Sequence, residues 1–103
     1  MKTLSEIQRQ LQAGVFQFTR HALKRAIERN IKEQEIREAG VNVTVIEDYP
    51  DDKYSPSCLL LGFTEAQRAL HLQVSRMESD TTKIITLYEP DENEWIDYKI
   101  RRK

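Results

Sequence analysis

The sequence predicts an α+β domain in which N-terminal helices pack on one face of a small antiparallel sheet. Apolar residues recur at helical spacing up to Gly40, and after it the chain turns to β-branched and alternating segments joined by short turns. The 103 residues suffice for one domain and contain no repeat or linker, so we assign residues 1–103 to a single domain. Its core is expected to extend from about residue 16 to residue 96.

Helical spacing predicts a first and a third helix. The first covers LSEIQRQLQAG, residues 4–14, where apolar residues fall at i, i+3 and i+7 and a glycine follows at the expected end. The next residues, VFQF, form a short extended piece. The third helix covers KEQEIREAG, residues 32–40, with two glutamates in its first turn, where they favour the positive end of the helix dipole.

The second helix is expected from about Arg20 to Asn30, with Thr19 as its N-cap. Its expected apolar stripe consists of Ala22, Leu23, Ala26 and Ile27. His21 lies nearly opposite this stripe, and Arg25 and Arg29 follow at i+4 and i+8, so the three form one row. Such a row is either a solvated helix face or a set of donors for phosphate, because guanidinium groups bind oxyanions in a bidentate way.

Four strands are expected after the helices, and the short turns between them predict an antiparallel meander. They cover VTVIEDY, CLLLGF, ALHLQVS and KIITLYE, residues 43–49, 58–63, 69–75 and 83–89. In the third strand, alternation places three apolar residues on one face and His71, Gln73 and Ser75 on the other.

A polar set is predicted on the open face of this sheet. If Ile85 and Leu87 pack beneath the helices, then Ile84 lies on the open face of the last strand with Thr86 and Tyr88. The expected set is then His71, Gln73, Thr86 and Tyr88. These are either ordinary polar residues on a wet face or groups able to transfer protons and bind phosphate oxygens. Lys53 in the PDDKYSP loop is a further candidate contact for a ligand.

Charge is spread unevenly along a chain whose net charge is −1. Residues 1–32 carry seven Lys or Arg and two Glu (+5), and residues 33–98 carry five Lys or Arg and fifteen Asp or Glu (−10). Residues 99–103 form a basic tail with four Lys or Arg (+4). This charge balance argues against a protein that coats nucleic acid without selectivity. If the two basic ends of the chain lie close together, however, they could bind an anion. The tail either contacts nucleic acid or is a disordered terminus, and Trp95 is expected to anchor it by packing.

Several protein classes are excluded or disfavoured by composition. The sequence contains no run of eighteen apolar residues, so no membrane span is predicted. The polar N-terminus lacks the apolar stretch of a signal peptide, so we expect a cytoplasmic protein. The single Cys58 forms no internal disulfide and is expected to act as a small buried hydrophobe. No Cys/His cluster has metal-binding spacing, so neither a metal nor another cofactor is expected.

Four stretches together resemble a bacterial domain family of unknown function. Members carry a Thr-x-His-Ala-x-x-Arg start, a Leu-His-Val-type strand and a Thr-x-Tyr-x-Pro end. The matching stretches are FTRHALKRAIERNI, VIEDYPDDKYSPSCLLLGF, RALHLQVS and IITLYEPDENEW. The resemblance covers roughly residues 16–96 and includes Thr19, His21, Ala22, Arg25, His71, Thr86, Tyr88 and Pro90.

Proteins of this kind are similar to distant relatives of the RelE/ParE-type toxins, whose helices precede an antiparallel sheet. The resemblance implies a RelE-like fold and an RNA substrate, since the ribonucleases among those toxins cleave RNA without metal, using basic and aromatic side chains. It also implies a zinc-finger antitoxin as partner, of the kind that pairs with MqsR-type toxins. Carried over residue by residue, the catalytic candidates are His21, Arg25, His71 and Tyr88.

Two functions remain open at this point. The first is a toxin-like, metal-independent endoribonuclease of a toxin–antitoxin pair, in which His71 or His21 serves as acid and base, Arg25 neutralises charge and Tyr88 orients the phosphate. The second is a non-catalytic domain that binds a partner protein or an RNA through the same face. The substrate-binding candidates are Arg29, Gln73, Thr86 and Lys53.

The two functions differ in the geometry that they require. Catalysis needs His21 or His71 within hydrogen-bond reach of a point shared with Arg25 and Tyr88, whereas binding does not. The chain is expected to be a monomer or a homodimer paired through an exposed sheet edge.

Overall fold

The computed structural model describes residues 1–103 as helices packed on one mixed sheet, followed by a small hairpin. In chain order the elements are α1 (Leu4–Gln12), β1 (Phe16–Phe18), α2 (Arg20–Glu28), α3 (Glu33–Gly40), β2 (Thr44–Tyr49), β3 (Ser57–Phe63), β4 (Ala69–Ser75), β5 (Thr82–Tyr88), β6 (Trp95–Ile96) and β7 (Ile100–Arg101). The five-stranded sheet has the order β1-β5-β4-β3-β2. The predicted α+β class and the meander are therefore confirmed.

The sheet is mixed rather than purely antiparallel. The expected extended piece after α1 becomes β1, which pairs in parallel with β5 and places Phe18 opposite Ile84. The other neighbouring strands are antiparallel. A parallel pair needs a long crossover connection, and here the segment from α2 to β4 supplies it.

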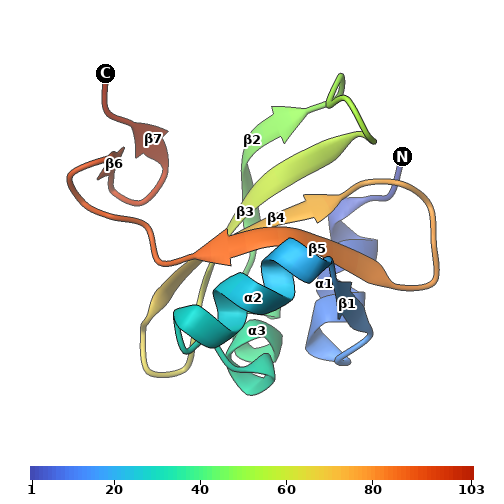
Figure 1. The fold of residues 1–103 in the computed structure, drawn as a ribbon, viewed down its shortest axis with the longest axis horizontal. Helices are drawn as coiled ribbons and strands as arrows, with labels where there is room; N and C mark the ends of the chain where they lie inside the picture. The colour runs from blue at the N-terminus through green and yellow to red at the C-terminus, as the bar shows by residue number, and fades with distance from the viewer.

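The three helices lie together on one face of the sheet (Figure 1). The loop between β2 and β3 and the C-terminal hairpin β6–β7 project on the other side (Figure 1). None of the helices has the length and apolar composition that crossing a membrane requires.

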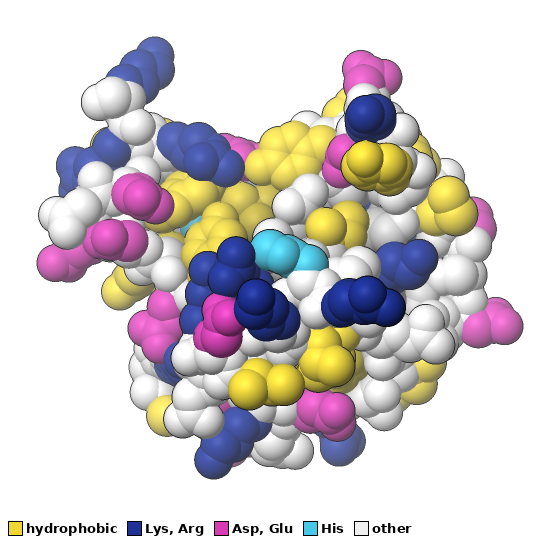
Figure 2. Space-filling model, viewed as in Figure 1, with side chains coloured by type: hydrophobic (Ala, Val, Ile, Leu, Met, Phe, Trp, Pro, Cys, Tyr) yellow, Lys and Arg dark blue, Asp and Glu magenta, His cyan; other side chains and the backbone are white.

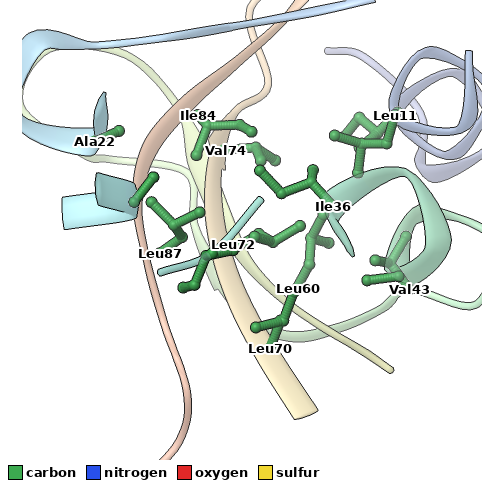
Figure 3. Packing of buried hydrophobic residues seen from close by; sticks show 14 of the residues in the cluster. Leu11, Ala22, Ile36, Val43, Leu60, Leu70, Leu72, Val74, Ile84 and Leu87 are labelled. Atoms are coloured by element: carbon green, nitrogen blue, oxygen red, sulfur yellow. The ribbon is translucent and has the colours of Figure 1, made fainter. Parts of the chain in front are cut away.

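The core lies between the helices and the sheet (Figure 3). Leu11 and Ile36 from the helices and Leu60, Leu72 and Leu87 from the sheet are fully buried in it. Burial of such side chains is the main favourable contribution to folding. Cys58 belongs to the same cluster, and burial raises the pKa of its thiol to about 11, as expected for a structural cysteine.

The predicted apolar stripe of α2 was wrong for its larger members. Ala22 and Ala26 are buried, but Leu23 is 49% exposed and Ile27 is 73% exposed. The helix turns its smallest side chains toward the core, and this lets its backbone approach the sheet closely. The side of α2 that faces the sheet therefore lies closer to Arg29 than the predicted stripe does. The row of His21, Arg25 and Arg29, called the basic row below, consequently runs beside the contact between α2 and the sheet.

The predicted faces of β5 were wrong for Ile84 and Ile85. Ile84, expected on the open face, is buried in the core with Leu87, and Ile85 lies instead in a cavity on the open face. The cause is a bulge, because Gln73 pairs with Thr86 while the next residue of β4, Val74, pairs with Ile84. The extra residue reverses the alternation on one side of the bulge.

The C-terminal segment is ordered rather than a free tail. Trp95 and Ile96 pair with Arg101 and Ile100 in a short antiparallel hairpin. Trp95 is only 3% exposed, which confirms its expected role as a packing anchor, and the Arg101 guanidinium lies 4.5 Å from the centre of its ring.

Gly62 in β3 allows α3 to approach the sheet, and its replacement by alanine should destabilise the protein. A Cβ at this position would lie 2.7 Å from the carbonyl oxygen of Ala39 and 2.9 Å from Cγ1 of Val43. We expect Gly62→Ala to lower the free energy of unfolding by about 1–3 kcal/mol in urea titrations, as overpacking does. The control Ala66→Ser, in the exposed turn before β4, should change it by less than about 0.5 kcal/mol. Equal stability of the Gly62 variant and the wild type would contradict this packing.

Candidate functional site

Helix α2 is fixed along the edge of β5 by two side chains at its ends. The hydroxyl of Thr19 donates to the carbonyl oxygen of Ile85 at 3.1 Å, and Nη1 of Arg29 donates to that of Leu87 at 2.7 Å. Strand β1 pairs with this edge of β5 only as far as Ile84. The side chains of Thr19 and Arg29 therefore donate to β5 carbonyl oxygens that have no partner in a neighbouring strand on this edge. As a result, the basic row of α2 borders the part of β5 that carries the open-face residues Thr86 and Tyr88.

Arg68, which precedes β4, fixes the end of this helix. Its Nη1 donates to the carbonyl oxygen of Asn30 and to the carboxylate of Glu35, both at 2.9 Å, and its Nη2 donates to the carbonyl oxygen of Arg29 at 3.0 Å. Its Nε forms an ion pair with Glu89. A cation at the C-terminal end of a helix satisfies unpaired carbonyls and interacts favourably with the helix dipole. This clamp holds the two residues that follow α2, Arg29 and Asn30, against α3 and the residue after β5.

The predicted row on α2 is present at the surface. His21 is exposed, Arg25 is partly exposed and pairs with Glu28 at 2.8 Å, and Arg29 bonds a backbone carbonyl rather than a carboxylate. Figure 2 shows Lys and Arg side chains on both sides of a histidine at this surface. Because Glu28 is the one acidic residue of the helix, α2 keeps an excess of positive charge.

His71 is buried beneath the C-terminal hairpin. Its Nε2 lies 2.6 Å from the carbonyl oxygen of Tyr98, its Nδ1 lies 3.2 Å from the hydroxyl of Tyr88, and the Trp95 ring centre is 4.5 Å from its own. A carbonyl oxygen can only accept, so Nε2 carries the hydrogen and Nδ1 accepts from Tyr88. Burial lowers the pKa of His71, and the ring is therefore held neutral.

The structure thus separates the four catalytic candidates into two pairs. His71 and Tyr88 bond each other on the open face, and His21 and Arg25 lie on α2. No hydrogen bond joins one pair to the other. In this arrangement both ring nitrogens of His71 are occupied, and its contact with the phenol positions Tyr88.

Two adjoining cavities hollow the open face between the β2–β3 loop and the C-terminal hairpin (Figure 2). One, of about 440 Å³, contains Thr19, Gln73 and Lys83 in its wall. The other, of about 470 Å³, reaches Arg101 and shares Asp52 and Gln73 with the first. We refer to these two cavities, which meet at Asp52 and Gln73, as the groove.

A third hollow lies at the other end of α2. It has a volume of about 540 Å³ and is lined by Arg29, Tyr88, Arg68 and three carboxylates. Thr19 and Arg29 are ten residues apart, so the helix spans roughly 15 Å between the groove and this hollow. The basic row therefore connects two concave regions of one surface.

The predicted binding residues are distributed over this surface. Gln73 and Thr86 are direct neighbours in the register of β4 and β5 and are half-buried. Lys53 lies in the exposed β2–β3 loop, with its Nζ 5.5 Å from the centre of the Tyr54 ring. No group of three or more His, Cys, Asp or Glu side chains could hold a metal ion.

Several residues of this surface were not predicted from the sequence. Asp52 is adjacent to the predicted Lys53 in the same loop, and its position there was the one available signal. Lys83 is the second residue of β5 and Arg68 ends a turn, and nothing in their local sequence distinguishes them from solvated charges. Arg101 reaches the groove only because the C-terminal hairpin folds over the sheet.

One comparison with known proteins identifies a relationship. The model of the family described as "Domain of unknown function (DUF4258)" matches residues 18–89, which is more than half of the chain. The matched region runs from the last residue of β1 to the residue after β5 and so includes both pairs of catalytic candidates. No curated protein and no solved structure matches the chain.

The buried neutral His71 should make the stability of the protein depend on pH. Because its pKa is lower in the folded state than the value of about 6.5 expected when unfolded, protons favour the unfolded chain below that pH. The contribution of His71 is thus present above about pH 6.5 and is lost as the pH falls toward the folded pKa. We expect urea unfolding to show a larger loss of stability from about pH 7.5 to about pH 5.5 in the wild type than in His71→Gln.

The matched control for that measurement is His21→Gln, which removes the exposed histidine and should retain the wild-type pH dependence. An identical pH dependence in His71→Gln and the wild type would contradict the neutral buried ring.

Proposed function

We propose a function on the premise that the chain belongs to the family of domains of unknown function whose model matches residues 18–89. The chain binds single-stranded RNA along the basic row of α2 and the groove on the open face of the sheet. The observation that carries this proposal is the alignment of His21, Arg25 and Arg29 along the edge of β5, between concave regions at both ends of the helix.

The charge of this surface supports a polyanion as the ligand. The Arg29 guanidinium donates to a carbonyl oxygen and forms no direct ion pair, although three carboxylates line the same hollow, and Lys83 has no ion-pair partner. Positive charges of this kind bind phosphate groups and release counterions from them. A strand that followed the row would meet Lys83 at one end of α2 and Arg29 at the other.

The shape and chemistry of the groove favour an unpaired strand. Its walls include the rings of Tyr49 and Tyr54, and Tyr88 lines the hollow beyond it. Unpaired bases can stack on aromatic side chains and enter cavities, whereas the bases of a duplex are held in their own stack. The resemblance to RelE/ParE-type toxins favours RNA among the polyanions that such a surface could bind.

RNA cleavage is a second candidate function, and one observation favours it. The exposed His21 lies one helical turn before Arg25, so a proton-transfer group and a charge-neutralising group share an accessible surface. In this version of the toxin-like ribonuclease, His21 acts as the acid or base, and His71 acts only through Tyr88. RNA binding without cleavage needs no proton transfer, and it is sufficient to explain the presence of all three residues of the basic row.

Removing charge from the row should weaken RNA binding. We expect Arg25→Gln and Arg29→Gln each to weaken binding of a labelled single-stranded oligonucleotide about 10- to 100-fold in fluorescence anisotropy, because a charge-assisted contact contributes about 1.5–3 kcal/mol. The slope of log K against log salt should fall by about 0.7 for each phosphate contact removed. Glutamine at position 29 keeps a donor for the carbonyl oxygen of Leu87.

The control for these variants is Arg9→Gln, which makes the same charge change on the exposed surface of α1. It should bind as the wild type does. An equal loss of affinity in all three variants, or a wild type without salt-dependent binding, would refute the proposed surface.

Cleavage is tested by incubating RNA with the purified protein in EDTA. If His21 transfers a proton, His21→Ala should slow cleavage about 10²–10⁴-fold, while His71→Phe, which removes only the bond that positions Tyr88, should slow it much less. Intact RNA at high concentrations of the wild type would eliminate the ribonuclease and leave the binding function.

A further inference from the structure

We infer that the 440 Å³ cavity at the start of α2 is a pocket for one nucleobase, and that the base it selects is guanine. The inference rests on the proposed function, because the base would belong to the RNA strand that follows the basic row. We call this cavity the base pocket. Its wall combines an aromatic ring, two apolar side chains, acceptors and a lysine, namely Tyr54, Met77, Ile85, Asp52, Gln73 and Lys83.

The apolar part of the base pocket suits a flat ring. Tyr54 is 86% exposed, so its ring has no packing role in the core and is free to cover a ligand. Met77 and Ile85 line the same cavity, and Ile85 points into it because of the bulge in β5. Stacking on an aromatic side chain is a general way to hold an unpaired base, and the flexible thioether of methionine adapts to a ring of any outline.

The polar part of the base pocket presents acceptors in a fixed arrangement. The buried hydroxyl of Ser57 donates to Oδ2 of Asp52 at 2.7 Å and accepts from Nε2 of Gln73 at 3.2 Å. This chain of hydrogen bonds orients both side chains. Oδ1 of Asp52 and Oε1 of Gln73 accept no hydrogen bond within the protein, so both oxygens are available to a ligand.

The two free acceptors, on Asp52 and Gln73, favour a base that has two neighbouring hydrogen-bond donors on one edge. Guanine carries a ring N–H beside an amino group, and both can donate to the carboxylate of Asp52 and the amide oxygen of Gln73. Adenine and cytosine place a ring acceptor beside their amino group, which would oppose these oxygens, and uracil has a single donor. Leaving buried polar groups unpaired is what rejects the wrong base.

Lys83 supplies the contact for the phosphate of the same nucleotide. It lies in the wall of the base pocket, is exposed, and forms no ion pair. A nucleotide with its ring under Tyr54 and its edge on Asp52 would therefore have a cation for its phosphate. That phosphate then lies beside Thr19, where the basic row of α2 begins.

The inference is tested with two labelled oligouridylates that differ in one central residue, guanosine or adenosine, and with guanosine and adenosine monophosphates in calorimetry. We expect the wild type to bind the guanosine-containing strand about tenfold more tightly, as one bidentate base contact provides. Asp52→Asn should bind both strands equally. Tyr54→Ala should weaken binding of both strands and both monophosphates by a similar factor and keep the preference for guanosine.

The outcomes separate this inference from the proposed function. Equal binding of the two strands by the wild type, with no preference among the monophosphates, would overturn the base pocket and leave the basic row standing. A preference for guanosine monophosphate without binding of either strand would support the pocket and refute the proposed RNA surface. A preference that survives in a folded Asp52→Asn variant would overturn the role of the carboxylate.

Discussion

The contacts of Arg68 are the constraint on which the candidate surface depends. One guanidinium bonds the last carbonyls of α2, a glutamate of α3 and the glutamate that follows β5. It bonds the carbonyl of Asn30, whose left-handed conformation (φ of 52°) ends α2 in a Schellman motif, with the amides of Asn30 and Ile31 donating to the carbonyls of Ile27 and Ala26. Without this clamp the carbonyls of Arg29 and Asn30 would lose their side-chain donor, and the position of Arg29 beside β5 would depend on its own bond to Leu87 alone. The basic row is thus a consequence of the packing of four elements.

Two histidines of one chain have different chemistry because of their surroundings. His71 lies beneath Trp95 and between two hydrogen-bond partners, so it is neutral and orders Tyr88, whereas His21 faces solvent beside two arginines. A pattern of residue types cannot distinguish a structural imidazole from a reactive one, and burial decides between them. For this reason the proposed ligand contacts lie at the edge of the sheet, beside α2, and in the adjoining groove, and not at His71 in the centre of the sheet.

Local patterns predicted the elements well, and long-range contacts explain what they missed. β4 was expected at residues 69–75 and is found there, since strict alternation is a strong signal. The inward direction of α2 and the bulge in β5 depend on tertiary packing, so Leu23, Ile84 and Ile85 were placed on the wrong faces. The cover over His71 comes from Tyr98, 27 residues away, and no local pattern encodes that contact.

The central claim is that an RNA strand lies along the edge of β5 and the basic row of α2. The most direct measurement is a titration of the isotope-labelled protein with a single-stranded oligonucleotide, followed by amide and arginine side-chain chemical shifts. We expect shift changes at His21, Arg25, Arg29 and Lys83 that saturate together and weaken as salt is added. Changes confined to the opposite edge strand, β2, or to α1 and α3, would contradict it.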